Sequence, residues 1–289
     1  MSGLARSLET SAAPAAITGG RADGIAYLHR PGRDHAVPIV LLHGIGSDAA
    51  SFVPLMQALD DHVAAIAWDA PGYGTSAPLA AEWPSADDYA ARLEALLVSL
   101  GVGPAIVVGH SLGCLVAAAY ARRHPDRVRG LLLLSPAIGY GAAPGGTLPE
   151  SVAARLVDLD RLGAEKFATL RAPRLVSDAA VLPAVTRAMA AVKMPGYGQA
   201  SRMLATGRLG DDVAALTRPV LVACGDEDRI TPPVQSATVA EAVSAEQRVR
   251  GELVLIAGAG HALPQERPDA VAALVAELVP HVGRAGGAP

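Results

Sequence analysis

The sequence predicts an α/β fold in which helices cover both faces of a mostly parallel, doubly wound sheet, and two patterns support this prediction. Short apolar runs without alternation recur along the chain, each bounded by Gly, Pro or Asp, as expected for strands buried on both faces. They occupy residues 37–42, 63–68, 105–108, 131–134, 219–223 and 253–257. Helical patterns separate these runs, and strands that alternate with helices are typical of a doubly wound sheet.

The elements follow from local spacing. Residues 87–100 place Tyr89, Leu93 and Leu97 at intervals of four, which is the period of an amphipathic helix. Residues 112–123 and 270–279 show the same periodicity. Ahead of the first strand, residues 17–29 contain the pairs Gly19-Gly20 and Asp23-Gly24, so we expect a leading hairpin there.

One long stretch breaks the alternation of strands and helices. Residues 138–216 contain no convincing strand but carry helical patterns at 152–162 and 181–192, and residues 139–149 are rich in Gly and Pro. We therefore predict one α/β core formed by residues 1–137 and 217–289. Residues 138–216 are expected to form a helical cap, or lid, inserted between two strands.

Composition excludes several classes of protein. The chain has 289 residues, of which 51% are hydrophobic, 18% charged and 3% aromatic, and its formal net charge is −4. Such a chain can bury a large core, and it lacks both the basic stripe and the rings that nucleic-acid binding requires. No apolar run approaches the ~18 residues of a spanning helix, so we expect no membrane span.

The cellular location is predicted from two further features. Cys114 and Cys224 both stand in apolar segments and offer no disulfide framework. The N-terminal residues carry Arg6 and Glu9 and lack a continuous apolar block, so they do not resemble a secretory signal. We expect a cytoplasmic protein; the sequence leaves open whether it is a monomer or a homodimer.

The most specific motif is Gly109-His110-Ser111-Leu112-Gly113, between the apolar run 105–108 and the helical pattern that begins at 112. A G-x-S-x-G segment between a strand and a helix is the pattern of a nucleophile elbow. The sharp turn lifts the Ser111 hydroxyl above the sheet and points a helix N-terminus at it. The N–H of Leu112 can then donate to a developing oxyanion.

With this motif the chain resembles the α/β-hydrolase superfamily along nearly its whole length. The family order is serine, acid, histidine, and two downstream loops match it. In residues 225–232, which resemble the acid loop, the carboxylate three residues after the Gly is Asp228, with Asp226 and Glu227 as alternatives expected to form a solvated turn. In the segment Gly260-His261, the resemblance assigns the catalytic base to His261.

The resemblance also implies an oxyanion hole. His43-Gly44-Ile45-Gly46 follows a strand and resembles the family's H-G-x-G segment, which makes the Ile45 N–H the second donor beside that of Leu112. His43 is expected to brace this loop. Asp69 stands in a segment that resembles the family's D-x-x-G-x-G-x-S loop and is expected to be a structural anchor.

Substrate contacts are less sharply indicated. Phe52 and His110 are candidates beside the active site, and Met189 and Met203 are candidates from the cap. Arg187, Arg202 and Arg208 are unranked candidates for holding a substrate carboxylate, because none is clearly placed for it. No P-loop, dinucleotide fingerprint, H-E-x-x-H or Cys/His cluster occurs, so we expect no cofactor and no metal.

These features predict a serine hydrolase that cleaves small to medium carboxylic esters through an acyl-enzyme on Ser111. The serine nucleophile argues against the dehalogenases and epoxide hydrolases of the fold, which use aspartate at the elbow. An enol-lactonase or a carbon–carbon hydrolase of aromatic degradation remains an alternative, as does a non-catalytic ligand-binding protein on the same fold. The natural substrate, the acyl-chain preference and the mobility of the lid are left open by the sequence.

Overall fold

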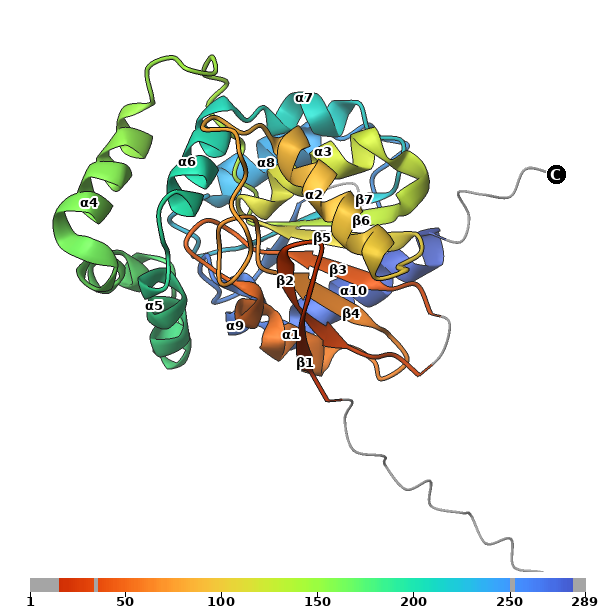
Figure 1. Ribbon diagram of the computed structural model, residues 1–289. Helices are drawn as coiled ribbons and strands as arrows, with labels where there is room; N and C mark the ends of the chain where they lie inside the picture. Colours follow the sequence, from red (N-terminus) through yellow and green to blue (C-terminus); the bar gives the residue numbers. More distant parts are fainter. Residues whose placement is uncertain (1–15, 34–35, 250–252, 283–289) are drawn as a thin grey trace, which may run out of the picture.

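A single eight-stranded sheet runs through the computed structural model, which describes residues 16–33, 36–249 and 253–282. Its spatial order is β1-β2-β4-β3-β5-β6-β7-β8 (Figure 1). The strands are β1 (Thr18–Ala22), β2 (Ile25–Arg30), β3 (Ile39–Leu42), β4 (Ala65–Trp68), β5 (Ala105–His110), β6 (Val128–Leu134), β7 (Val220–Gly225) and β8 (Val254–Ile256).

The strand pairing matches the predicted fold class. β1 and β2 form an antiparallel hairpin, β2 also pairs antiparallel with β4, and every other neighbouring pair is parallel. Strands β3, β4, β5 and β7 are buried at every position, which explains why their sequences are continuous apolar runs rather than alternating ones. The predicted α/β-hydrolase fold is therefore confirmed.

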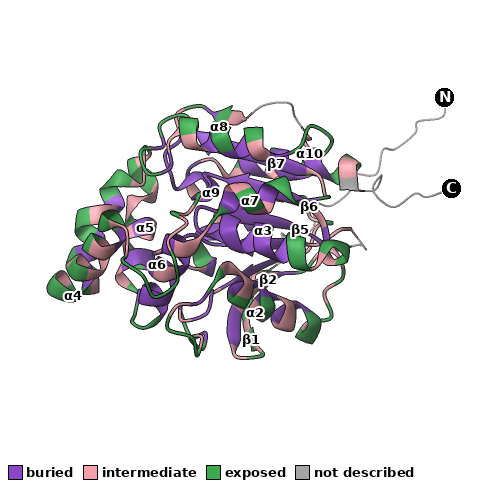
Figure 2. Ribbon diagram, turned by 90° about the horizontal axis from the view of Figure 1, so that it is seen from above, coloured by how far each residue is buried: buried purple, intermediate pink, exposed green. Residues whose placement is uncertain are grey.

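Helices cover both faces of the sheet (Figures 1 and 2). On one face, α1 (Val53–Ala58) and α10 (Pro268–Val282) pack together with the short α9 (Leu263–Glu266). On the other face lie α2 (Ala86–Ser99), α3 (Gly113–Arg123) and α8 (Pro233–Ala242). The two apolar clusters that result are separated by the sheet, and the buried strands appear purple in the middle of Figure 2.

Between β6 and β7 the chain forms helices only. They are α4 (Glu150–Arg171), α5 (Leu182–Ala190), α6 (Gly196–Thr206) and α7 (Leu209–Ala214). Helices α4 and α5 pack on each other and lie to one side of the sheet, at the left of Figure 1. Helix α7 instead returns to the body of the protein and contacts α3 and α8.

Candidate active site

Ser111 stands at the junction of β5 and α3. Its φ of 53° places it in the left-handed region that non-glycine residues rarely adopt. The Ser111 N–H donates to the carbonyl of Leu134 on the neighbouring strand over 2.9 Å, and the Ser111 carbonyl accepts from the N–H of Ala137. These bonds hold the strained turn, as the strand–turn–helix motif requires.

The glycines on either side of Ser111 are required sterically. A Cβ on Gly109 would lie 2.7 Å from the Cα of Cys114, and one on Gly113 would lie 2.7 Å from the carbonyl carbon of Leu42. Real Cβ atoms do not approach backbone this closely, so any other residue would push α3 away from β5 or from β3. The motif therefore reflects the close packing of a helix against two strands.

Asp228 and His261 are in direct contact. The Nδ1–H of His261 donates to Asp228 Oδ2 over 2.9 Å, and both side chains are buried. The other carboxylate oxygen accepts from the N–H groups of Ile230 at 2.8 Å and Thr231 at 3.0 Å. The aspartate is thus fixed by its own loop, and it fixes the tautomer of His261 with Nε2 available as a base.

The environment keeps Asp228 ionised. Burial alone would raise the pKa of this carboxyl, but the charge of His261 and the hydrogen bonds from His261, Thr231 and Ile230 outweigh burial. The net effect lowers the pKa of Asp228 well below its usual range. A buried carboxylate held ionised against an imidazole can stabilise the imidazolium that forms when the base takes a proton.

Thr231 is a member of this network that the sequence did not single out. Its hydroxyl lies 3.0 Å from Asp228 Oδ2, 3.2 Å from His261 Nδ1 and 3.0 Å from the carbonyl oxygen of Ser135. It links Asp228, His261 and the end of β6. Asp226 and Glu227, the alternative acids, are exposed, and Asp226 caps the N–H of Gly258 at 2.8 Å.

His110 is buried beside His261. Its Nε2 lies 2.7 Å from the carbonyl oxygen of His261, and the two rings are 5.0 Å apart. Burial and the charge of His261 lower the pKa of His110 to about 3, so the ring is neutral and donates its Nε2–H to that carbonyl. This bond ties the elbow to the loop that carries His261.

The loop after β3 approaches Ser111 closely. A Cβ on Gly44 would lie 2.9 Å from the Cβ of Ser111. His43 braces the loop, because its Nδ1–H donates to the carbonyl of Gly44 at 2.8 Å and its Nε2 accepts the N–H of Ala70 at 3.0 Å. Asp69 anchors the adjacent segment by accepting the N–H of Ala49 at 2.8 Å.

A pocket of about 210 Å³ opens onto Ser111. Ile45 and Leu112, whose N–H groups are the predicted oxyanion donors, line it together with Ser111. Among the described residues neither of these two N–H groups donates to another protein group. The remaining lining residues are Ala137, Ile138, Gly139, Tyr140, Arg155, Leu204, Ile230, Thr231 and Gln235.

A second, much smaller cavity of about 20 Å³ lies beside His261. It shares Ile45 with the larger pocket and is also lined by His110 and Gln265. A cavity of this size can hold about one water molecule. His110, His261 and Gln265 therefore bring polar side chains to a water-sized space whose other lining residues include the apolar Leu175, Val185 and Ala188.

The four predicted substrate contacts occupy different places. His110 lines the small cavity, whereas Phe52 is fully buried in the apolar cluster beneath α1 and α10. Met189 and Met203 are buried in the cluster between the helices of residues 138–216 and the sheet. The large pocket instead takes Leu204 and Arg155 from these helices.

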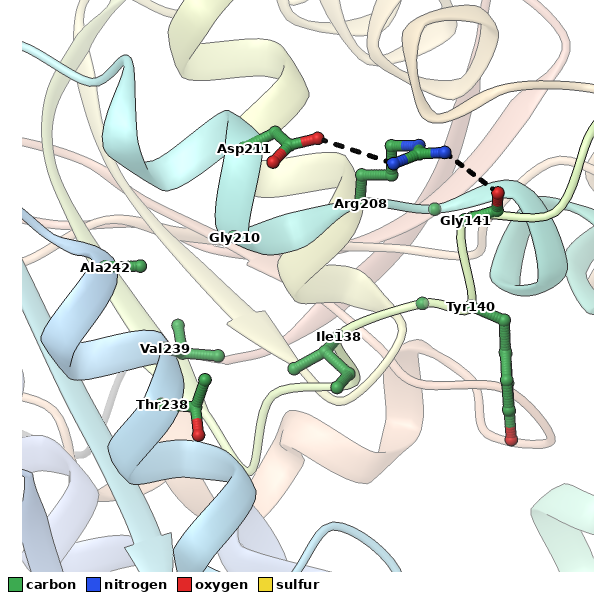
Figure 3. A pocket seen from close by; sticks show the side chains of 11 residues that line it. Ile138, Tyr140, Gly141, Arg208, Gly210, Asp211, Thr238, Val239 and Ala242 are labelled. Carbon is green, nitrogen blue, oxygen red and sulfur yellow. Dashed lines mark hydrogen bonds and ion pairs between the residues drawn. The ribbon is translucent and has the colours of Figure 1, made fainter.

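The three arginines considered from the sequence lie away from Ser111. Arg187 is exposed on α5, and Arg202 pairs with Glu82 at 3.3 Å. Arg208 lies in a neighbouring pocket, where it donates to the carbonyl of Gly141 at 3.0 Å and faces Asp211 at 3.9 Å (Figure 3). Arg155 was not a candidate from the sequence, because its place in the pocket depends on how α4 packs against α5 and α6.

Glu266 connects the base loop to the helices between β6 and β7. Its buried carboxylate accepts the N–H groups of Ser177 and Asp178, each at 2.9 Å, and that of Gly260 at 3.1 Å. Gly260 directly precedes His261. The orientation of the imidazole is therefore coupled to the segment that follows α4.

This geometry is accompanied by a clear family relationship. A sequence model of the alpha/beta hydrolase family matches residues 39–274, which is most of the chain. The chain belongs to the alpha/beta hydrolase family. The match runs from the start of β3 into α10, so it includes Ser111, Asp228 and His261 of this hydrolase.

Relatives of this alpha/beta hydrolase include enzymes with different substrates. It is 29% identical over 243 residues to 2-(acetamidomethylene)succinate hydrolase of Mesorhizobium japonicum, covering 80% of this chain and 84% of that one. It is 31% identical over 267 residues to Lipase LipV of Mycobacterium tuberculosis, covering 86% and 95%. These relatives are hydrolases, and this chain is a hydrolase of the same family.

Solved structures agree with the fold. The enol-lactonase of Burkholderia xenovorans superposes with a TM-score of 0.78 at 24% identity, covering 91% of this chain and all of that one. A thermophilic esterase of Thermogutta terrifontis has a TM-score of 0.73 at 26% identity, covering 92% and 97%.

Two properties can be stated for the described part of the chain only. No group of three or more His, Cys, Asp or Glu side chains there is arranged to hold a metal ion. No helix within residues 16–33, 36–249 and 253–282 combines the length and the apolar character that crossing a bilayer requires.

Proposed function

We propose that this alpha/beta hydrolase is a serine carboxylesterase that acts on small to medium esters. The observation that carries the proposal is that Ser111 stands in a strained elbow and that Asp228 and His261 form a buried, hydrogen-bonded pair. In the proposed reaction Ser111 Oγ attacks the acyl carbon while His261 Nε2 takes its proton. Asp228 orients His261 and stabilises the imidazolium.

The alcohol then leaves with the proton that His261 returns, and an acyl-enzyme remains on Ser111. Water releases the acid in a second step with the same acid–base pair. The water-sized cavity between Ile45, His110 and His261 supports this step, because it offers a place for the attacking water next to the base.

The N–H groups of Ile45 and Leu112 are proposed to bind the oxyanion. Both segments line the pocket with Ser111, and both amides are unused by the described protein groups. Leu112 is also the N-cap residue of helix α3, so the helix dipole adds to the stabilisation of negative charge. Each such donor contributes a factor on the order of 10²–10³ to turnover.

The helices of residues 138–216 are proposed to act as a cap that limits substrate size. The pocket of about 210 Å³ is smaller than the roughly 300–1,000 Å³ of drug-sized sites, which favours short acyl chains. Leu204 of α6 and Arg155 of α4 contribute to its lining. A monomer or homodimer in the cytoplasm remains our proposal for the state and location of the protein.

Lactone hydrolysis is a second candidate because it uses the same attack on an acyl carbon. The structural similarity to an enol-lactonase and the sequence similarity to a hydrolase of a substituted succinate support this second candidate. The difference between the two activities lies only in whether the leaving alcohol stays attached to the acyl group.

The proposal is tested with p-nitrophenyl acetate and butyrate, an enol-lactone and a dienoic diketone. Ser111→Ala is expected to abolish turnover of the esters, whereas the control Ser99→Ala, on the exposed end of α2, should retain wild-type kcat/KM. Ester turnover that survives Ser111→Ala would contradict the proposal. Exclusive turnover of the diketone would replace it with carbon–carbon hydrolysis.

A further inference from the structure

One charged side chain stands in the pocket above Ser111. Of the twelve residues that line this pocket, Arg155 is the only one with a formal charge, and no carboxylate is among them. The polar neighbours are neutral: Tyr140, Thr231 and Gln235. A ligand in this pocket therefore meets one cation and no compensating anion from the protein.

Among the described residues Arg155 has no acidic partner, in contrast to four other arginines of residues 138–216. Arg161 and Arg171 face Asp158, Arg202 faces Glu82 and Arg208 faces Asp211. Among the described residues no carboxylate lies within 4.0 Å of the Arg155 guanidinium. Its Nε donates to the carbonyl of Ser151 over 3.5 Å, and the neutral phenol of Tyr197 is close enough to interact with it electrostatically.

The surroundings add further positive charge to this position. Arg155 is half-buried on α4, and Arg171 of the same helix lies near enough for the two guanidiniums to repel each other. Burial, together with repulsion from Arg155 and Arg174, lowers the pKa of Arg171. An anion bound at Arg155 would relieve part of this repulsion.

The adjoining pocket does not offer the same chemistry. Figure 3 shows Arg208 held between the carbonyl of Gly141 and the carboxylate of Asp211. That guanidinium already has its hydrogen-bond acceptor and its counter-charge. Arg155 is thus the unpaired cation that shares a cavity with Ser111.

The neutral groups around Arg155 fit a carboxylate at this end of the pocket. The Tyr140 hydroxyl is bonded to Ser151 Oγ at 2.8 Å, one turn before Arg155, and the Gln235 amide donates to the carbonyl of Pro136 at 2.9 Å. A guanidinium can bind a carboxylate through two parallel N–H donors, which fixes the orientation of the bound molecule.

We propose that the substrate carries a carboxylate, and that Arg155 binds it while Ser111 attacks the ester or lactone carbonyl at the other end of the same pocket. This inference rests on the proposed esterase function and specifies its substrate class. The small volume of the pocket limits the distance between the two groups, so the substrate is a short half-ester, an acyloxy acid or the corresponding lactone.

Matched anionic and neutral esters test the proposal in a pH-stat. To test a carboxylate on the acyl part of the substrate, kcat/KM for monomethyl glutarate is compared with that for dimethyl glutarate, divided by two because the diester has two ester groups. The alcohol side is tested with 4-acetoxybutanoate against its methyl ester. The wild-type enzyme is expected to prefer the anionic member of at least one pair in kcat/KM by about 10- to 100-fold, the range of a charge-assisted contact.

Arg155→Met should remove this preference, mainly by lowering kcat/KM for the anionic ester, and Arg155→Lys should retain part of it. Arg187→Met is the control, because it removes one exposed cation from α5 and should leave the preference within twofold of wild type. A wild-type enzyme without preference in either pair, or a preference that survives Arg155→Met, would overturn the proposal.

The outcome separates this inference from the function on which it rests. If wild type hydrolyses the neutral esters and Ser111→Ala does not, the esterase function stands whatever the charge preference is. If neither kind of ester is hydrolysed, both the function and the inference fail.

Discussion

Replacing Asp228 by Asn removes the negative charge of this side chain and keeps its shape. The side chain keeps its size, but the ionised acceptor that faces His261 Nδ1 becomes a neutral amide. Its oxygen can still accept from Ile230 and Thr231. The amide NH₂ then faces His261 and favours the tautomer in which Nε2 carries the proton and cannot act as a base.

The size of the effect follows from the geometry. With 2.9 Å between the bonded atoms, the two charge centres lie about 4 Å apart, and at an effective dielectric constant of about 20 they attract by about 4 kcal/mol. At about 1.4 kcal/mol for each factor of ten, this corresponds to about 10³ in rate. Loss of the correct tautomer brings the expected loss closer to 10⁴.

The assay is kcat/KM for p-nitrophenyl butyrate at pH 8, with the melting temperature measured alongside to show that each variant is folded. Glu227→Gln is the matched control, because this neighbouring carboxylate is exposed. We expect it to stay within twofold of wild type. A loss below tenfold for Asp228→Asn, or a comparable loss for Glu227→Gln, would refute the assignment of the acid.

Three further predictions concern stability and the support of the site. Because His110 has a pKa of about 3 in the folded protein and about 6.5 when unfolded, its contribution to stability is complete above pH 6.5 and falls as the pH drops. The free energy of unfolding, measured with urea, should fall between pH 8 and pH 5, and His110→Gln should make this fall smaller by about 2 kcal/mol. An unchanged dependence of the unfolding free energy on pH in the variant would contradict this. Glu266→Gln should cost about 1–3 kcal/mol and lower kcat, because Gly260 loses its ionised acceptor; unchanged stability and turnover would argue against this coupling. Gly113→Ala should prevent folding or lower the melting temperature far below that of wild type. A Cβ at Gly210 would meet open space, so Gly210→Ala should raise the free energy of unfolding by about 0.4–1 kcal/mol, measured by thermal unfolding. Equal effects of the two substitutions would show that the elbow has room for a Cβ.

The sequence predicted those features that depend on short stretches of chain. Buried parallel strands such as 105–110 produce continuous apolar runs, and a turn as tight as the one at Ser111 demands glycines at fixed offsets. The leading hairpin was visible in the same way, since Thr18 pairs with His29. In each case the local residues alone determine the backbone.

Features that depend on how distant segments meet were harder to predict. Helix α8 begins at Pro233 directly after the acid loop, and its weak amphipathic pattern gave no sign of a helix. Phe52 follows the loop after β3, yet it points into the core beneath α1 rather than into the pocket. Arg155 reaches the pocket because of how α4 packs against α5 and α6, and nothing local to α4 encodes that position.

The central claim is that Ser111 forms the covalent intermediate, and the most direct test is its reaction with a fluorophosphonate ester followed by mass spectrometry. We expect a single adduct on the peptide that contains Ser111, no adduct on Ser111→Ala, and greatly slowed labelling of His261→Ala. Labelling of another residue, or no labelling of an enzyme that still hydrolyses esters, would contradict the account.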